Sequence, residues 1–351
     1  MSALLDYARA VVNDIQYRLF GPRHSVPEPI EPFTVKKARI FFTNGVGTPI
    51  VGVTSWVADE LVPNDIKGAI AEGFRRVEIS TVYHNERLIG EGIAKAIKEK
   101  LVKRKELFVV LKVWLHEIDN NDIRKKVVDT LKEMKLKKVD LLQAHISATY
   151  NAVSAELAKK IWLQMHQIYK SGLTKSLGVV NWRTDQIRRV MNLFLTPVHN
   201  SQRELDICYV DLDHWEFCED YNITFTKYGT LGNPNRLNYT VTSTHDMDWA
   251  VRSMETGTEI IRDIAKSHEA TAPKVMLRYA IHNGFVSRPS INMIYLPEQY
   301  QTFFRLSQEE LLALENGQVS HKLRVWNITT GYTEDLPPAP STPKMERRAK
   351  L

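Results

Sequence analysis

The chain has 351 residues, of which 43% are hydrophobic and 25% charged, a globular composition that excludes collagen, coiled coil and global disorder. The formal net charge is +6, but residues 344–351 contribute +3 of it, and the remaining +3 is too weak to indicate nucleic-acid binding. The two cysteines, Cys208 and Cys218, imply no disulfide framework, and no uncharged apolar run approaches the roughly 18–20 residues of a transmembrane helix.

The first twenty residues predict an amphipathic helix, because apolar residues recur at helical spacing from Leu4 to Leu19. Asp6 and Asp14 interrupt this segment, which is therefore unlike a secretory signal. The helix is expected to dock on the main domain or, alternatively, to bind a membrane surface or a partner. Four prolines in residues 21–33 predict an extended linker, so residues 1–40 are assigned to a helix and a Pro-rich linker.

The next region, residues 41–320, alternates β-rich runs with helical patterns. Strands are predicted at 74–79, 107–113, 139–144, 175–180, 223–227 and 284–288, with weaker ones near 50–54 and 197–201. Helices are predicted at 85–98, 121–135, 155–171, 184–194, 256–268 and 272–283.

This alternation predicts an α/β fold built from βαβ units with a parallel sheet. Eight such units over this length fit a (β/α)8 TIM barrel with an N-terminal helical extension and a C-terminal tail. A doubly wound sheet is the alternative. It would normally carry a Gly-x-Gly-x-x-Gly turn after an early strand, and the sequence has none.

Polar residues follow three predicted strands in succession. Glu78, Lys112 and His145 end strands, and Tyr83 lies five residues beyond Glu78. In a barrel these four side chains would meet at the carboxyl-end mouth, where catalytic residues of this fold lie. A Tyr hydroxyl has an ordinary pKa of about 10, and a neighbouring ammonium lowers it. With Glu78 holding Lys112 and a neutral His145 orienting a carbonyl oxygen, the set suits proton donation as a hydride arrives.

The sequence resembles the aldo-keto reductase superfamily over roughly residues 41–316, with the motifs in matching order and spacing. The matching segments are Glu78-Ile-Ser-Thr-Val-Tyr-His-Asn-Glu86, Leu111-Lys-Val-Trp114, Val139 to His145, Lys175-Ser-Leu-Gly-Val-Val-Asn181, Thr226-Lys-Tyr-Gly-Thr-Leu-Gly232 and Leu277-Arg-Tyr279. The resemblance implies a barrel that reduces aldehydes or ketones with NADPH. It gives Tyr83 the acid role, Lys112 the pKa-lowering role and His145 the orienting role.

The resemblance also implies a cofactor site. Asn181 would hold the nicotinamide carboxamide, and Tyr228 would stack on the ring. The cofactor-binding positions are Ser55, Asn181, Gln202, Tyr228, Gly229, Thr230, Leu231, Arg288 and Ser290. Trp56 and Trp114 are the expected substrate contacts, with Trp326 and Tyr150 as further candidate walls. No metal is implied.

Four departures from the family pattern bear on function. Glu78 replaces the family's Asp and is one methylene longer, so it reaches Lys112 only if the backbone or rotamer adjusts. Val180 replaces the Ser before Asn181. Either His199 or Gln202 could serve as the family's Gln. The adenine-phosphate clamp is altered around Arg288, and Gln299 stands where the family's following Arg is expected, so NADPH is expected with weaker discrimination against NADH.

Residues 321–351 form a Pro-rich, then basic, tail that ends in Ala349-Lys350-Leu351. This tripeptide resembles the Ser-Lys-Leu signal that a peroxisomal import receptor reads, so a peroxisomal or glycosome-type location is expected, with the cytoplasm as the alternative. A monomer or weak dimer is expected.

Three functions fit the sequence. The first is an active NADPH-dependent carbonyl reductase. The second is a catalytically impaired nucleotide-binding barrel that acts as a sensor or scaffold, as Glu78, Val180 and the altered clamp would allow. The third is related isomerase, cyclase or alkene-reductase chemistry on the same site, because a fold does not decide which reaction it carries out.

Overall fold

The computed structural model describes most of the central region of the chain. The described residues are 39–54, 60–117, 122–146, 154–193, 195–204, 211–228, 259–282, 286–288 and 304–316. The predicted N-terminal helix, the linker and the C-terminal tail lie outside them. Within the described residues, no helix combines the length and the apolar character needed to cross a bilayer.

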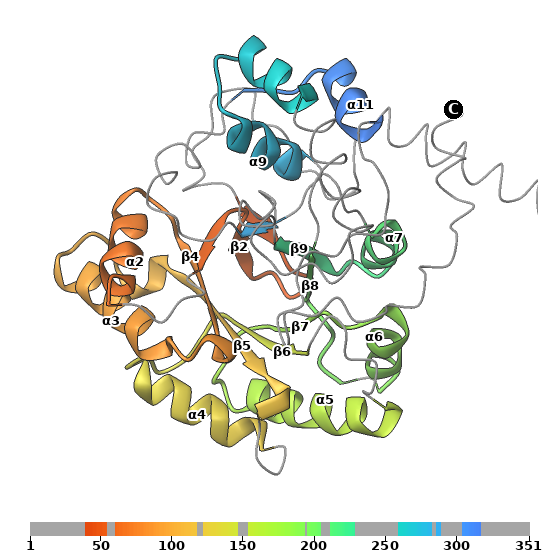
Figure 1. The fold of residues 1–351 in the computed structure, drawn as a ribbon. Helices are drawn as coiled ribbons and strands as arrows, with labels where there is room; N and C mark the ends of the chain where they lie inside the picture. Colours follow the sequence, from red (N-terminus) through yellow and green to blue (C-terminus); the bar gives the residue numbers. More distant parts are fainter. Residues whose placement is uncertain are drawn as a thin grey trace, which may run out of the picture.

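Eight parallel strands form one curled sheet, which is the barrel wall of a (β/α)8 fold (Figure 1). The strands are β3 (Gly52–Thr54), β4 (Arg76–Ser80), β5 (Phe108–Trp114), β6 (Leu141–His145), β7 (Leu177–Val180), β8 (Asn200–Glu204), β9 (Thr224–Tyr228) and β10 (Val286–Arg288). They are hydrogen-bonded in sequence order, and the two end strands, β3 and β10, are also in contact. The order confirms the predicted succession of βαβ units.

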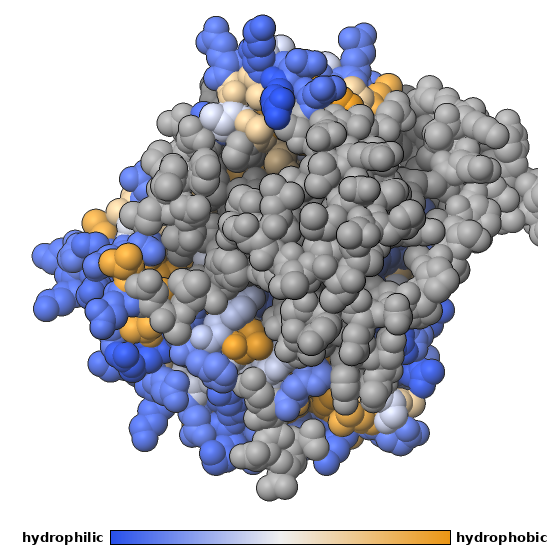
Figure 2. Space-filling view, in the orientation of Figure 1, coloured by the Kyte–Doolittle hydropathy of each residue, from blue (hydrophilic) through white to orange (hydrophobic). Residues whose placement is uncertain are grey.

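Helices surround the outside of this sheet (Figure 1). They are α2 (Val62–Ala71), α3 (Glu86–Lys98), α4 (Ile123–Glu133), α5 (Ala155–Lys170), α6 (Thr184–Met191), α7 (Leu212–Asp220), residues 259–267, α9 (Ala272–His282) and α11 (Gln308–Asn316). Each of α2 to α6 turns a buried apolar stripe toward the strands, and hydrophilic residues cover much of the outer surface (Figure 2). Short 3-10 turns lie at Thr81–Tyr83, Arg104–Glu106 and Leu115–Glu117.

A hairpin of β1 (Arg39–Phe41) and β2 (Gly47–Pro49) packs at the amino ends of the barrel strands. Gly45 has a φ of +79°, which its turn requires. Asn44 next to it donates through Nδ2 to the Lys175 carbonyl at 3.0 Å, just before β7. Phe42 packs edge-on against Phe108 at 6.0 Å, so the hairpin seals the lower interior with apolar rings.

Several elements differ from the predictions. Strand β8 begins three residues later than expected, at Asn200. Helices α2, α7 and α11 and the hairpin were not predicted, although each carries a local signal. In α11 the signal is Ser307, whose Oγ accepts from the Glu310 N–H at 3.1 Å. Helix α2 has Pro63 in its first turn, and α7 has Asp211 as N-cap, accepting from the His214 N–H at 3.2 Å. Asn44-Gly45 is a recognisable turn pair.

Candidate active site

Side chains on the inner face of the barrel follow the two-residue period of the strands. In β4, Arg76, Glu78 and Ser80 share the inner face, and all three are fully buried. Ser80 pairs in register with Lys112, and Trp114 pairs with His145. Because the strands are parallel, Lys112 and His145 lie toward the same carboxyl end of the barrel, as predicted, whereas Arg76 begins β4 at the amino end.

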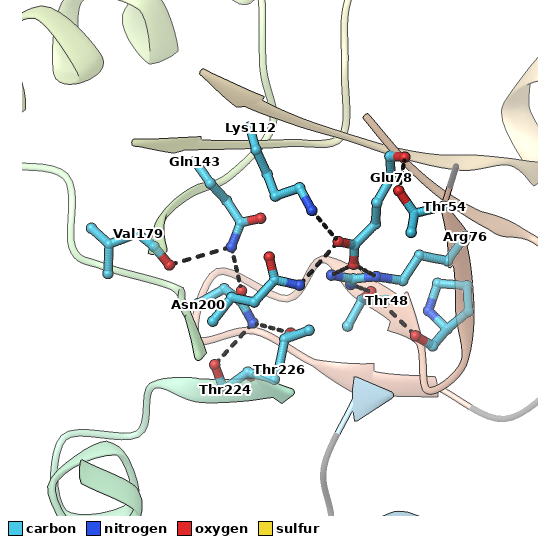
Figure 3. A network of polar contacts seen from close by, with 12 residues as sticks. Thr48, Thr54, Arg76, Glu78, Lys112, Gln143, Val179, Asn200, Thr224 and Thr226 are labelled. Carbon is cyan, nitrogen blue, oxygen red and sulfur yellow. Dashed lines mark hydrogen bonds and ion pairs between the residues drawn. The ribbon is translucent and has the colours of Figure 1, made fainter. Parts of the chain in front are cut away.

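Glu78 lies at the centre of a buried ion-pair network (Figure 3). Its Oε2 lies 3.3 Å from Lys112 Nζ, so the expected pair is present despite the longer side chain. Its Oε1 lies 2.7 Å from Arg76 Nη2 and accepts from Arg76 Nε at 2.8 Å. Gln202 donates from Nε2 to Oε2 at 3.0 Å. Charge-assisted contacts of this kind hold a buried carboxylate in its ionised form.

Arg76 is the one member of this network that the sequence analysis did not select. It is fully buried, and its guanidinium carbon lies 5.4 Å from the Phe108 ring centroid. Its Nη1 donates to the Thr48 hydroxyl. The signal for its inward position is the two-residue spacing from Glu78 on one strand, which places both side chains on the same face.

His145, at the end of β6, is held by a hydrogen bond with the Ser80 hydroxyl. Its Nδ1 lies 3.0 Å from Ser80 Oγ, and its ring meets the Trp114 ring edge-on at 4.7 Å. Because Ser80 engages Nδ1, a hydrogen bond from His145 to a substrate would use Nε2. Trp114 is buried beside this ring, where it forms an apolar wall.

Tyr83 ends the 3-10 turn that follows β4, and it is half-buried. The next residue, His84, has a φ of +50°, and helix α3 starts two residues later. Thr81 Oγ1, in the same turn, accepts from the Trp114 N–H at 2.8 Å. The turn that carries Tyr83 is therefore anchored to the end of β5, the strand that carries Lys112.

Asn181, Gln202 and Tyr228, all predicted to contact a cofactor, come together on neighbouring strands. Asn181 follows β7 with a φ of +65°, and its Nδ2 donates to the Ile146 carbonyl at 2.8 Å. The Tyr228 hydroxyl donates to Asn181 Oδ1 at 2.8 Å. Gln202 Oε1 is buried and has no hydrogen-bond partner among the described residues.

The position of β8 decides between His199 and Gln202. Gln202 lies within the strand and reaches Glu78, whereas His199 precedes the strand and stacks on Tyr169 at 6.2 Å. His199 Nδ1 also accepts from the Leu177 N–H at 3.1 Å. Burial lowers the pKa of His199 to about 4, so the ring is neutral near neutrality and serves packing.

A second, uncharged network crosses the barrel beside the ion pairs (Figure 3). Gln143 Nε2 donates to Asn200 Oδ1 at 2.8 Å, and Asn200 Nδ2 donates to Thr226 Oγ1 at 2.8 Å and to the Thr224 carbonyl at 2.9 Å. Gly178 makes room for it, because a Cβ there would lie 2.6 Å from the Asn200 carbonyl oxygen. None of these residues was predicted to belong to the site.

Comparison with known proteins decides the family. The model of the aldo/keto reductase family matches residues 45–318, more than three quarters of the chain. The chain belongs to the aldo/keto reductase family. Prostaglandin F synthase 2 from Bos taurus is 27% identical over 306 residues, covering 80% of this chain and 91% of that protein. Dihydrodiol dehydrogenase 3 from the same species is also 27% identical, with coverages of 85% and 97%.

Solved structures of aldo-keto reductases share the fold. The Bombyx mori aldo-keto reductase in complex with NADP has a TM-score of 0.69 at 24% identity and covers 83% of this chain and 95% of that chain. The aldose reductase from Schistosoma japonicum gives the same values. This family of oxidoreductases accounts for the strand order and for the resemblance of the motifs.

Several predicted site positions lie outside the described residues. They are Ser55, Trp56, Tyr150, Gly229, Thr230, Leu231, Ser290, Gln299 and Trp326. The backbone of Arg288 ends β10, next to Tyr228 in register, but its side chain is not described. Among the described residues, no group of His, Cys, Asp or Glu has the arrangement of a metal site.

Proposed function

We propose that this aldo/keto reductase is an NADPH-dependent reductase of aldehydes or ketones. The observation that carries the proposal is the buried pair between Lys112 on β5 and Glu78 on β4, at 3.3 Å, with β4 leading directly into the turn that bears Tyr83. A buried ammonium near a phenol favours the phenolate and so makes the phenol a better acid. A family member with this pair, a Tyr and a His at one mouth has the groups needed to protonate a carbonyl oxygen.

In the proposed reaction, each residue has a separate task. The Tyr83 hydroxyl would give its proton to the carbonyl oxygen of the substrate. Lys112 would stabilise the phenolate that remains, and Glu78 would keep Lys112 charged and in place. His145 would donate from Nε2 to the same carbonyl oxygen, because Ser80 engages Nδ1. Trp114, beside His145, would provide an apolar surface for the substrate.

The residues on β7 to β9 fit a nicotinamide cofactor. When bound, NADPH supplies the hydride. Gln202 Oε1 is a buried acceptor without a partner among the described residues, as required to receive the N–H of a carboxamide. The Asn181 N–H donates to the Gln202 main-chain carbonyl at 2.9 Å, and Tyr228 binds Asn181, so these two residues would hold the carboxamide and the ring. Arg288 and Ser290 would bind the 2′-phosphate, with NADH accepted more weakly.

A binding measurement followed by a rate measurement tests this proposal. NADPH is added to the wild type while tryptophan fluorescence is recorded, and its oxidation is then followed with a panel of aromatic and aliphatic aldehydes. We expect fluorescence quenching, NADPH oxidation, and loss of oxidation in Tyr83→Phe with the quenching unchanged. Equal oxidation by wild type and Tyr83→Phe would contradict the acid role.

A nucleotide-binding barrel without turnover is the second candidate. The observation in its favour is that Asn181 and Gln202 already bind within the protein, to Ile146, Tyr228 and Glu78. Quenching by NADPH without oxidation of NADPH across the whole carbonyl panel would favour this function over the reductase.

A further inference from the structure

Arg76 is a buried cation below the proposed acid site. It lies two residues before Glu78 on β4, and neither side chain is exposed to solvent. Its guanidinium contacts Glu78 through Nε and Nη2, Thr48 through Nη1, and the Phe108 ring. A buried arginine is costly unless it is paired, and Arg76 is paired with Glu78.

The two oxygens of Glu78 have different partners. Oε1 binds Arg76 at 2.7 Å, whereas Oε2 is shared by Lys112 at 3.3 Å and Gln202 at 3.0 Å. The carboxylate therefore bridges a cation at the barrel floor and a cation at the mouth (Figure 3). An Asp at this position is one methylene shorter, so its carboxylate would not span the same two partners. The longer side chain is thus matched to Arg76.

Gly52 on β3 leaves space for the aliphatic part of the Arg76 side chain. A Cβ at Gly52 would lie 2.7 Å from Arg76 Cγ and 2.8 Å from Cδ, closer than real Cβ atoms approach. Gly52 pairs directly with Arg76 in the β3–β4 register. Gly52, Arg76 and Glu78 are therefore sterically and electrostatically dependent on one another.

We propose that Arg76 is a positioning residue for the proposed carbonyl reduction, on which this inference rests. It holds Glu78 Oε1 at the floor, so that Lys112 shares a single carboxylate oxygen with Gln202. Two cations then share one carboxylate. Because Arg76 offsets part of the negative charge of Glu78, the positive potential of Lys112 is less cancelled at the barrel mouth, where the Tyr83 hydroxyl would act as the acid.

The test compares Arg76→Met, Glu78→Asp and the double variant with Arg75→Met as a matched control. Arg75 is a buried neighbour whose Nη1 donates to the Ile70 and Phe74 carbonyls, on the face of the strand opposite to Glu78. We expect Arg76→Met to lower kcat by about ten- to a hundredfold, because a misplacement of about 1 Å at a site costs that much. KM for the aldehyde and Kd for NADPH should stay within about threefold of the wild-type values, because Arg76 contacts neither ligand in the proposed site.

The double variant gives the decisive readout. Glu78→Asp alone should lose at least about tenfold in kcat, and combining it with Arg76→Met should restore part of that loss, because the shorter carboxylate then pairs with Lys112 alone. If Arg76→Met fails to fold, Arg76→Lys replaces it, with kcat expected to fall about tenfold because the two-pronged contact is lost.

Three results would overturn the inference while leaving the proposed function intact. They are wild-type kcat in Arg76→Met or Arg76→Lys, equal losses in Arg75→Met and Arg76→Met, and multiplicative losses in the double variant. A wild type that oxidises no NADPH with any carbonyl would overturn the proposed function and the positioning role together.

Discussion

The two sides of the barrel interior are built from different interactions. On the proposed acid side, strands β4 and β5 hold Arg76, Glu78 and Lys112 in contacts between full charges. On the proposed cofactor side, strands β7 to β9 bring together Asn181 and Tyr228, which are joined by a neutral hydrogen bond. Gln202 belongs to both, because its Nε2 binds Glu78 while its Oε1 has no partner among the described residues.

This difference suggests that the two halves of the site behave differently when ligands bind. The ion pairs of Glu78 are fixed before binding, whereas the hydrogen bond between Asn181 and Tyr228 can be exchanged for one with the nucleotide. Charged groups fixed before substrate arrives need no reorganisation during the reaction, which is the main electrostatic advantage of an enzyme site. A neutral hydrogen bond contributes only about 0.5–1.5 kcal/mol to stability, so a bound nucleotide can replace it at little cost. We therefore expect substitutions on the acid side to alter kcat and those on the cofactor side to alter nucleotide affinity.

The largest effect is expected from Lys112→Met. It removes the ammonium from the acid side and leaves Glu78 with Arg76 and Gln202. We expect kcat for aldehyde reduction to fall by about a thousandfold, within the range of general acid catalysis, with a smaller change in Kd for NADPH. Steady-state kinetics and fluorescence titration give the two values.

Lys227→Met is the matched control for that variant. Lys227 is also a buried lysine, but it lies 5.9 Å from the Tyr279 ring of α9, on the outer side of β9. Comparable losses of kcat in the two lysine variants would mean that burial of a lysine, and not its place beside Glu78, determines the rate.

The next effect concerns the free energy of unfolding at acid pH, which depends on the buried His199. Burial lowers the pKa of His199 to about 4 from 6.5, so the unfolded chain takes up the proton first as the pH falls. Stability should decline from about pH 6.5 downward and level off near about pH 4, with a loss of about 2 kcal/mol from His199 by about pH 5. Urea unfolding of wild type and His199→Gln at both ends of this range measures the difference. An identical pH dependence in the two proteins would contradict the assignment.

A smaller effect is expected from Asn181→Gly. Glycine accepts the φ of +65° at this position, so the variant removes the carboxamide without backbone strain. We expect Kd for NADPH to rise about tenfold, which is about 1.4 kcal/mol, while kcat at saturation stays close to wild type. Isothermal calorimetry and steady-state rates check the two parts.

Tyr228→Phe is the control for the cofactor side. It keeps the ring but removes the hydroxyl that donates to Asn181. A change in Kd of less than about threefold is expected, because the ring supplies most of the contact area. For Asn181→Gly, a lower kcat with an unchanged Kd for NADPH would contradict the expected difference between the proposed acid side and the proposed cofactor side.

The sequence predicted the features that depend on local patterns. Alternating strands and helices identified the barrel, and polar residues near the ends of predicted strands pointed to Glu78, Lys112 and His145. In the structure His145 ends β6, whereas Glu78 and Lys112 each lie two residues before their strands end. Arg76 was not identified, because an arginine in a charged pair such as Arg75-Arg76 looks like a solvated residue. Only the strand register shows that Arg76 points inward while Arg75 binds the carbonyls of Ile70 and Phe74.

The amide network could not be predicted for a related reason. Gln143, Asn200 and Thr226 come from three strands, and their contacts depend on how those strands are staggered. The sequence placed β8 three residues too early, which left the choice between His199 and Gln202 open. The peroxisomal signal at Ala349-Lys350-Leu351 stays a prediction, because the tail lies outside the described residues.

A crystal structure of the protein with NADPH tests the separation of the two halves most directly. We expect the contacts of Glu78 with Arg76 and Lys112 to be unchanged, and Asn181 to exchange its bond with Tyr228 for one with the nicotinamide carboxamide. A nucleotide bound away from the barrel mouth, or one that requires the ion pairs of Glu78 to break, would contradict the account.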